Sequence, residues 1–354
     1  MRIKRIAAGI LAAAAVLSLS LTLFACGKKS DKTLYIYNWS EYIPQEVYDL
    51  FRQETGIEVK ETTFEDNEEM LAKLEAQGAS RYDLVVPSSY VIGIMKQKGY
   101  IQPIEKDKVP NLKNISADAL GKNFDPNNEY SLPYMATMTV IAVNVPKLAE
   151  LGVEIKSLND LLDPRLEKNL VVVDDQRELI SAALKATGQD PDTQDEATIL
   201  GTLDWLIALK KNVKEFSTNN SKVALETNSV AAGLVFNLDA GLAIFENPDI
   251  TVIYTTEPCE LAMDNFVITA GAKHKDYAQQ FIDFVYRPEI YKMILDEFPG
   301  VCLNDAAKAL LDEDYLANPG ATVDSYELGR AHITQDVGDA VEYYDDVYTK
   351  MKIN

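Results

Sequence analysis

The sequence predicts an α/β protein with two lobes, each built on a mainly parallel sheet flanked by helices. The length of 354 residues is enough for two domains of ordinary size. Strands and helices alternate three times between residues 33 and 99, an order that produces a parallel sheet with helices on its faces. A long apolar stretch at residues 137–143 predicts a strand that crosses from one lobe into the other.

The N-terminal segment has the pattern of a secretory signal. A basic head precedes an uncharged run over residues 6–25. The basic residues are Arg2, Lys4 and Arg5. The run is long enough to be an uncleaved membrane anchor, but residues 23–26, Leu-Phe-Ala-Cys, resemble a bacterial lipobox. We therefore expect a signal peptide over residues 1–25, followed by a lipidated Cys26 and a polar tether over residues 26–32.

The first half of the remaining chain alternates β-formers with helical patterns. Expected strands are residues 33–37, 57–62 and 82–86. Expected helices begin near Pro44, Met70 and Tyr90 and end near Gly56, Gly78 and Gly99. Ligands of such sheets bind beyond the carboxyl ends of the strands. The loops 38–43, 64–67 and 87–90 are therefore the first candidates for a binding site.

The second half repeats these patterns less regularly. Expected strands are residues 137–143, 169–173, 231–236, 250–255 and 266–270. Expected helices are residues 158–162, 178–187, 196–209, 277–286 and 337–352. No internal repeat is visible, so two α/β lobes fit the pattern better than one large sheet.

Charge and composition exclude several functions. The 34 basic and 55 acidic residues give a net charge of −21, and removal of the three basic signal residues would make it −24. Nucleic acid and anionic lipid headgroups need clustered Lys and Arg, so we expect no nucleic-acid partner and membrane contact only through the lipid anchor. The only histidines, His274 and His332, are far apart, which disfavours a histidine metal site or catalytic triad.

A motif search finds no support for catalysis. The sequence lacks G-x-G-x-x-G, Walker-type and G-x-S-x-G motifs, and it has neither C-x-x-C nor H-E-x-x-H. We therefore expect neither an enzyme nor a bound cofactor or metal.

Six short stretches, in order along the chain, resemble the spermidine/putrescine-binding proteins of polyamine ABC importers. They are residues 37–44, 82–90, 124–134, 174–178, 262–264 and 335–338. The resemblance implies a type II periplasmic-binding-protein-like fold, in which two lobes joined by crossing strands close over a ligand. It implies a first lobe of residues 33–138 with 264–308, and a second lobe of residues 139–263 with 309–354.

The resemblance also implies a function. The protein would be a monomeric extracytoplasmic lipoprotein that captures a polyamine and delivers it to an ABC transporter permease. Two alternatives stay open. The protein could be the same kind of importer binding protein with another organic cation or small solute as its ligand, or a surface lipoprotein that senses a ligand.

A polyamine needs aromatic faces for its stem and carboxylates for its amines. By resemblance, the loops after the first and third strands supply part of this site. The implied residues are Trp39, Ser40, Glu41, Tyr42, Ser88 and Tyr90. Glu41 could equally be a solvated loop charge.

Three further carboxylates are implied as amine partners. Asp175 and Glu178 match family positions, although Asp-x-x-Glu after a strand is also a capping box. Asp174 could cap the helix instead and free Asp175. Asp264 matches a third position, with a turn or hinge aspartate as the alternative.

The sequence departs from the family at one end of the site. Phe236 and Ala262 replace tryptophans, no tyrosine is in register near Gly300, and Thr334 or Gln335 replaces a glutamine. Either Tyr254 or Phe298 replaces the missing aromatic side chains in the site, or the protein has a different ligand specificity from the family. Cys259 and Cys302 lie beside these changes in the sequence, so a disulfide between them is a further hypothesis, allowed outside the cytoplasm.

Overall fold

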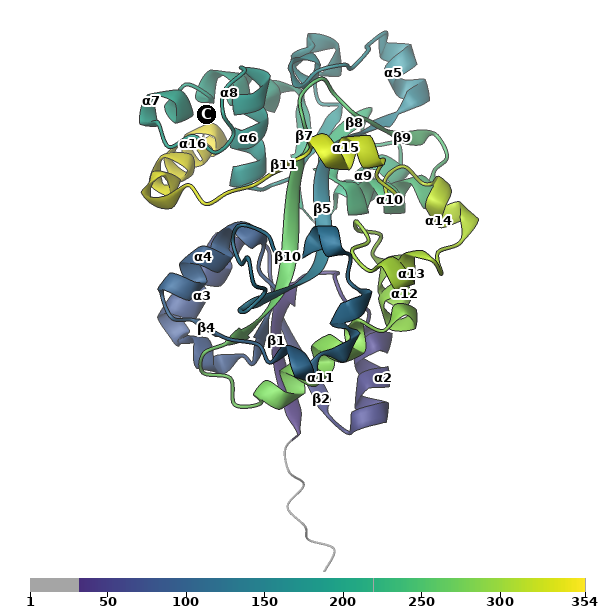
Figure 1. Cartoon of the computed structure of the whole chain (residues 1–354). Helices are drawn as coiled ribbons and strands as arrows, with labels where there is room; N and C mark the ends of the chain where they lie inside the picture. Colours follow the sequence, from purple (N-terminus) through teal and green to yellow (C-terminus); the bar gives the residue numbers. More distant parts are fainter. Residues whose placement is uncertain (1–31, 219, 354) are drawn as a thin grey trace, which may run out of the picture.

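The computed structural model describes residues 32–218 and 220–353 and has two lobes joined by two long strands (Figure 1). The joining strands are β5 (Ser131–Asn144) and β10 (Glu260–Thr269), which pair antiparallel and contribute to both lobes. The expected signal peptide and Cys26 lie outside the described residues. Within residues 32–218 and 220–353, no helix is both long and apolar enough to cross a membrane.

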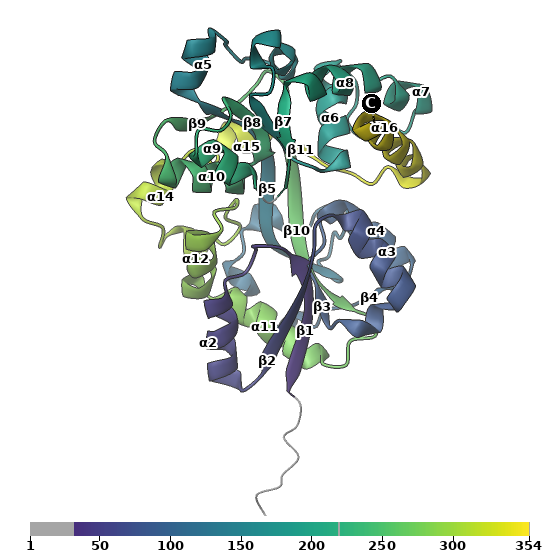
Figure 2. The same cartoon turned by 180° about the vertical axis from the view of Figure 1, so that it is seen from behind.

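The first lobe contains a parallel core of β1 flanked by β2 and β3, with β3 and β4 antiparallel to β10. Helices cover both faces of this sheet, α3 and α4 on one side and α2, α11 and α12 on the other (Figures 1 and 2). Its strands are β1 (Thr33–Trp39), β2 (Glu58–Phe64), β3 (Leu84–Val85) and β4 (Ile101–Gln102). Its helices are α2 (Gln45–Thr55), α3 (Asn67–Gln77), α4 (Ser89–Gln97), α11 (Lys275–Val285), α12 (Pro288–Glu297) and α13 (Asp305–Lys308).

The second lobe pairs β6 in parallel with β7 and β8, while β5 runs antiparallel to β8 and β9. Its strands are β6 (Leu170–Val172), β7 (Val213–Phe216), β8 (Ala232–Phe236), β9 (Ile250–Ile253) and β11 (His332–Ile333). The helices on one side are α6 (Gln176–Ala186), α7 (Glu196–Leu200), α8 (Leu203–Asn212) and α16 (Val341–Ile353). Those on the other are α5 (Val145–Leu151), α9 (Ser221–Glu226), α10 (Asn237–Glu246), α14 (Glu313–Ala317) and α15 (Ser325–Arg330).

The register of the crossing strands determines which side chains share a face. Ala262 lies opposite Thr137, and Glu260 lies opposite Thr139. The register shifts between Asp264 and Asn265, and such a β-bulge redirects the neighbouring side chains. Because β5 and β10 cross from one lobe to the other side by side, they form the floor of the space between the lobes.

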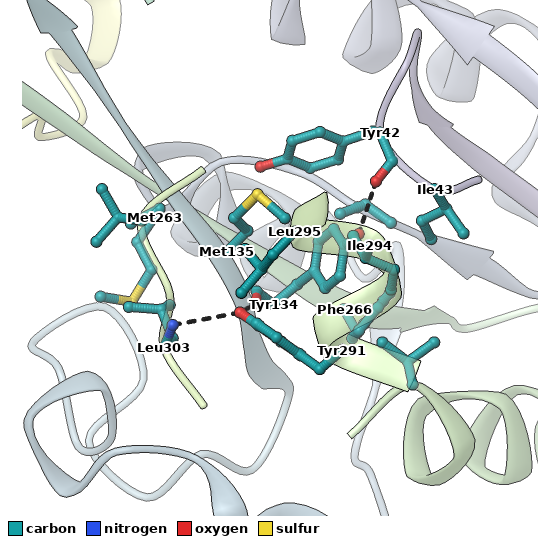
Figure 3. Packing of buried hydrophobic residues seen from close by; sticks show 14 of the residues in the cluster. Tyr42, Ile43, Tyr134, Met135, Met263, Phe266, Tyr291, Ile294, Leu295 and Leu303 are labelled. Carbon is teal, nitrogen blue, oxygen red and sulfur yellow. Dashed lines mark hydrogen bonds between the residues drawn. The ribbon is translucent and has the colours of Figure 1, made fainter. Parts of the chain in front are cut away.

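One cluster of buried aromatic and aliphatic side chains extends from the first lobe into the second, and Figure 3 shows part of it around Tyr134. The hydroxyl of Tyr134 donates to the backbone oxygen of Tyr42 at 2.7 Å, and the backbone N–H of Leu303 donates to the Tyr291 hydroxyl at 3.3 Å. The loop after β1 is thus held to the core, which fixes the position of the Tyr42 ring.

The predicted two-lobed α/β fold is confirmed, but the expectation of a separate, mainly parallel sheet in each lobe is wrong. The strands of the described residues form one mixed sheet through both lobes, because the crossing strands β5 and β10 pair antiparallel with each other and with strands of each lobe. Two of the expected elements also differ in extent. β5 and β10 are longer than the expected strands, because the turn-rich residues before 137 already pair with β10. The expected helix over residues 196–209 is broken into α7 and α8, and the Thr202 hydroxyl at the break bonds back to the Ile199 oxygen at 2.7 Å.

The hypothesis of a disulfide is wrong for this structure, in which Cys259 and Cys302 are both free thiols. Cys259 directly precedes β10 in the second lobe, whereas Cys302 lies between α12 and α13 in the first. The Cys302 thiol donates to the oxygen of Asn304 at 3.3 Å. Burial raises the pKa of both thiols to about 11, so both stay protonated at neutral pH.

Candidate ligand-binding cleft

A cavity of about 100 Å³ lies between the lobes. All three loops expected to form a site, those after β1, β2 and β3, contribute to it from the first lobe. The start of α6 and the end of β8 contribute from the second lobe, and the crossing strands contribute Thr137, Ala262 and Asp264. The carboxyl ends of the strands therefore meet at this cleft, as a parallel sheet requires.

Five aromatic side chains line the cleft. They are Trp39, Tyr42, Phe64, Tyr90 and Phe236. Trp39 is the last residue of β1 rather than a loop residue, and its ring packs on Phe64 with centroids 4.5 Å apart. Phe64, at the end of the paired strand β2, thus supports one wall of the cleft.

Asp264 is the most enclosed carboxylate of the cleft floor. Its side chain is 3% exposed; Ser88 Oγ donates to Oδ1 at 2.6 Å, and the Tyr42 hydroxyl donates to Oδ2. Burial raises the pKa of Asp264 to about 6, although both hydrogen bonds lower it. Both partners are neutral hydroxyl groups, so no residue in 32–218 or 220–353 pairs this carboxylate with a cation. It lies within a crossing strand, not in a turn.

Asp175 both caps a helix and lines the cleft. Its Oδ1 accepts from the backbone N–H groups of Arg177 at 2.8 Å and Glu178 at 3.0 Å, at the start of α6. The alternative in which Asp174 caps the helix is therefore wrong. Asp174 instead accepts hydrogen bonds from Tyr348 and Lys352. Burial is the largest cause that raises the pKa of Asp175.

Glu178 does not complete a capping box. Its Oε2 accepts from Thr139 Oγ1 at 2.6 Å, so its carboxylate points away from the helix terminus and lines the cleft. Burial, followed by the charges of Glu260 and Asp175, raises the pKa of Glu178 to about 8.

Ser40 and Glu41 lie at the rim of the cleft. The Glu41 side chain is 50% exposed, and its Oε2 pairs with Lys222 Nζ at 2.6 Å. Glu41 comes from the first lobe and Lys222 from the second, so this ion pair connects the lobes. The Glu41 carboxylate is thus not fully solvated, and a cationic ligand would have to compete with Lys222 for it.

Of the two candidates for the family glutamine, only Thr334 lines the cleft. Thr334 Oγ1 donates to Glu260 Oε2 at 3.0 Å. The side chain of Gln335 turns away from the cavity: its Nε2 donates to the Ile333 oxygen at 2.6 Å, and its Oε1 accepts from Asn123 at 3.0 Å. The expectation that Gln335 faces the site is therefore wrong for this structure.

Several lining residues were not predicted. Arg177 extends along the cleft, with its guanidinium 5.5 Å from the Tyr90 ring centroid and 3.0 Å from Asp192 Oδ1. Asp239 accepts from Ser221 Oγ at 2.5 Å, and burial raises the pKa of Asp239 to about 6. Arg177 and Asp239 each lie in the first turn of a helix, a few residues after a strand. That position in the sequence could have identified both as residues of the cleft. The others are Phe64, Glu65, Asn67, Thr137, Thr218 and Leu238.

At the end of the cleft where the family's aromatic residues are missing, the expected substitutes Tyr254 and Phe298 do not take their place. Neither Tyr254 nor Phe298 lines the cavity, so that interpretation is wrong. The Met135 side chain occupies the space that a Cβ at Gly300 would need, so a tyrosine there would require that side chain to move. Ala262 forms the floor at this end opposite Thr137.

The cleft is strongly acidic. Among the described residues, six carboxyl groups line it, against the one guanidinium of Arg177, which is already paired with Asp192. The six are Glu41, Glu65, Asp175, Glu178, Asp239 and Asp264. Such a mixture of carboxylates and aromatic faces suits an organic cation. Two lobes enclosing a site of this kind define a solute-binding protein.

Comparison with known proteins gives the family. Residues 46–346 match the bacterial extracellular solute-binding protein family, and the chain belongs to it. The chain is 35% identical over 335 residues to the spermidine/putrescine-binding periplasmic protein of Escherichia coli, which covers 95% of this chain and 96% of that protein. Members of this family bind solutes for transport, so the protein is a binding protein and not an enzyme.

Two solved structures are similar over most of the chain. The TpPotD lipoprotein of Treponema pallidum is 27% identical with a TM-score of 0.81, covering 91% of this chain and 100% of that one. The spermidine/putrescine ABC transporter substrate-binding protein PotD of Streptococcus pneumoniae is 28% identical with a TM-score of 0.75, covering 91% and 99%.

Proposed function

We propose that this protein captures a polyamine outside the cytoplasm and delivers it to the permease of an ABC importer. The observation that carries the proposal is Asp264, a buried carboxylate that faces an aromatic cleft and whose side-chain partners among the described residues are hydroxyl groups. Support comes from the names of its relatives, which include spermidine/putrescine-binding and putrescine-binding periplasmic proteins.

The remaining parts of the proposal concern attachment and movement. A lipid on Cys26 would hold a monomeric protein at the outer face of the membrane. The first lobe, residues 33–138 with 264–308, and the second, residues 139–263 with 309–354, would close over the ligand by hinge motion. The ion pair between Glu41 and Lys222 and the hydrogen bond between Asn123 and Gln335 would stabilise the closed state.

The direct test is calorimetry on the chain beginning at Gly27, after unfolding and refolding to remove any ligand carried through purification. We expect saturable binding of at least one of putrescine, spermidine and spermine, and none of choline or arginine. An absence of heat and of thermal shift with every polyamine would contradict the proposal. Binding of choline or arginine alone would favour the alternative of another organic cation.

Enlarging the aromatic face at the end of β8 should strengthen binding. We expect Phe236→Trp to raise polyamine affinity about threefold, because an ammonium interacts more strongly with indole than with benzene, by up to about 1 kcal/mol. Phe245→Trp is the matched control, since Phe245 lies outside the cleft and is 44% exposed. An unchanged affinity in Phe236→Trp would show that the ligand does not stack on this wall.

A further inference from the structure

An open groove lies beside the ligand cleft, on the flank of the second lobe; we call it the side groove. Its lining comes from α9, α10 and α14 of the second lobe and from Asp296 of α12 in the first. Figures 1 and 2 show α12 beside α10 and α14. The volume of the side groove is about 520 Å³, which exceeds that of the cleft. Both lobes therefore contribute to this groove.

Exposed apolar side chains gather around the side groove. Leu242, Phe245 and Tyr315 line it, and the ring centroids of Phe245 and Tyr315 are 6.4 Å apart. Among the described residues, eight large hydrophobic side chains are exposed, and four of them lie on α9, α10, α14 or the segment between α13 and α14. These four are Val223, Phe245, Leu310 and Leu316. Such a gathering on one flank is typical of an interaction surface.

The charges of the side groove are mostly negative. Its carboxylates are Glu226, Glu246, Asp296, Asp312 and Asp314. Asp296 pairs with a lysine of its own helix, and Asp312 caps α14. Within residues 32–218 and 220–353, no ion pair or side-chain hydrogen bond reaches the carboxylates of Glu226, Glu246 and Asp314. The side groove therefore favours a partner that carries positive charge.

Lys222 connects the side groove with the ligand cleft. It lines the groove, and its Nζ pairs at 2.6 Å with Oε2 of Glu41, which lines the cleft. Glu41 and Asp296 belong to the first lobe, whereas Lys222 belongs to the second. A movement of one lobe against the other would therefore change the shape of the groove and the length of this ion pair. The side groove has its present shape only in the present arrangement of the lobes.

We propose that the side groove docks the permease of the ABC importer by receiving a permease segment with Lys or Arg on one face and apolar side chains on the other. The inference rests on the proposed function. The unpaired carboxylates select a basic segment, and Phe245 requires an apolar contact beside it. A second copy of this chain fits poorly, because its net charge is −21. The permease must distinguish loaded from empty protein, and a groove formed by both lobes makes that distinction available to it.

The test separates docking from ligand capture. Uptake of polyamine into lipid vesicles that contain the importer is measured against the concentration of polyamine-saturated protein, and calorimetry measures the polyamine affinity. Glu246→Lys reverses the charge of the last residue of α10, where lysine suits the helix dipole. Glu150→Lys is the matched control, because Glu150 is exposed near the end of α5 and does not line the groove. Phe245→Ser removes the exposed ring, and Val145→Ser is its control at another exposed apolar residue.

We expect Glu246→Lys and Phe245→Ser each to raise the protein concentration for half-maximal uptake about tenfold, the size of a typical interface hot spot. Neither variant should change the polyamine affinity, and both controls should behave as the unmodified protein does. Thermal unfolding checks that each variant is folded.

Unchanged uptake with every variant, or an equal loss in Glu246→Lys and Glu150→Lys, would overturn the inference and leave the proposed function intact. A dimer of the unmodified protein that Phe245→Ser dissociates would also overturn it, because a second copy would then occupy the groove. Failure of every polyamine to bind would instead remove the proposed function itself.

Discussion

Replacing Asp264 by asparagine is expected to weaken polyamine binding by about a hundredfold, within the range for removing one partner of a buried charge pair. The Asp264 carboxylate is buried at the β-bulge of β10 and has hydroxyl groups of Tyr42 and Ser88 as its hydrogen-bond partners. No ion pair from residues 32–218 or 220–353 reaches it, so an amine beside it would supply a cationic partner. Asparagine keeps the size of the side chain but loses the charge, so the loss should appear in affinity, measured by calorimetry.

The stability of the ligand-free protein should distinguish this loss from misfolding. In Asp264→Asn the introduced amide oxygen could still accept the hydrogen bond from Ser88, and the variant no longer buries a titratable group. We therefore expect thermal unfolding of Asp264→Asn without ligand to change little. Asp276→Asn, the same substitution at an exposed position on α11, is the control and should bind as the unmodified protein does. Normal binding by Asp264→Asn would mean that the amine lies elsewhere.

The sequence was sufficient for the features that depend on local pattern. Pro44 before α2 and Gly56 after it, in the left-handed region at φ 71°, bound that helix as expected. Alternating strands and helices led to the three loops that the structure gathers at the cleft. This works because parallel strands place all their carboxyl ends on one edge, whatever the details of packing.

The sequence was not sufficient to decide which of two adjacent residues faces the cleft or caps a helix. Thr334 and Gln335 are adjacent, yet Thr334 faces the cleft and Gln335 bonds to Asn123 of the other lobe. Likewise, the choice between Asp174 and Asp175 as the cap depends on partners from the distant helix α16, which holds Asp174 through Tyr348 and Lys352. Such contacts join residues that are far apart in the sequence, and no local pattern contains them.

The affinity for a polyamine should rise with pH between about 5.5 and 8, because the acidic groups of the empty cleft bind protons more tightly than usual. Burial raises the pKa of Asp264 and Asp239 to about 6 and that of Glu178 to about 8. Below these values the carboxyl groups are neutral, and a cation that binds them must displace a proton. Polyamine nitrogens resemble the lysine amine, with a pKa near 10, so they stay charged in this range. Each proton released costs up to about tenfold in affinity per pH unit below the group's pKa.

The same carboxyl groups should make the free energy of unfolding of the ligand-free protein change with pH in the opposite direction to the affinity. A carboxyl group whose pKa is raised on folding binds more protons in the folded state, so the free energy of unfolding falls as pH rises from its ordinary value towards the raised one. For Glu178 that window extends from about 4.5 to about 8. Bound polyamine should reverse the trend, because it favours the ionised form.

Calorimetry at several pH values, in two buffers with different heats of ionisation, counts the protons released on binding. We expect net release at pH 7, reduced in Glu178→Gln. That variant should keep the proton release that arises from Asp264, Asp239 and Asp175. An affinity that is independent of pH, with no proton release in either buffer, would show that these carboxyl groups are already ionised before the ligand arrives. The cleft would then attract a cation with its full charge at every pH tested, and the buried Glu178 would have to be stabilised by a donor other than the ligand.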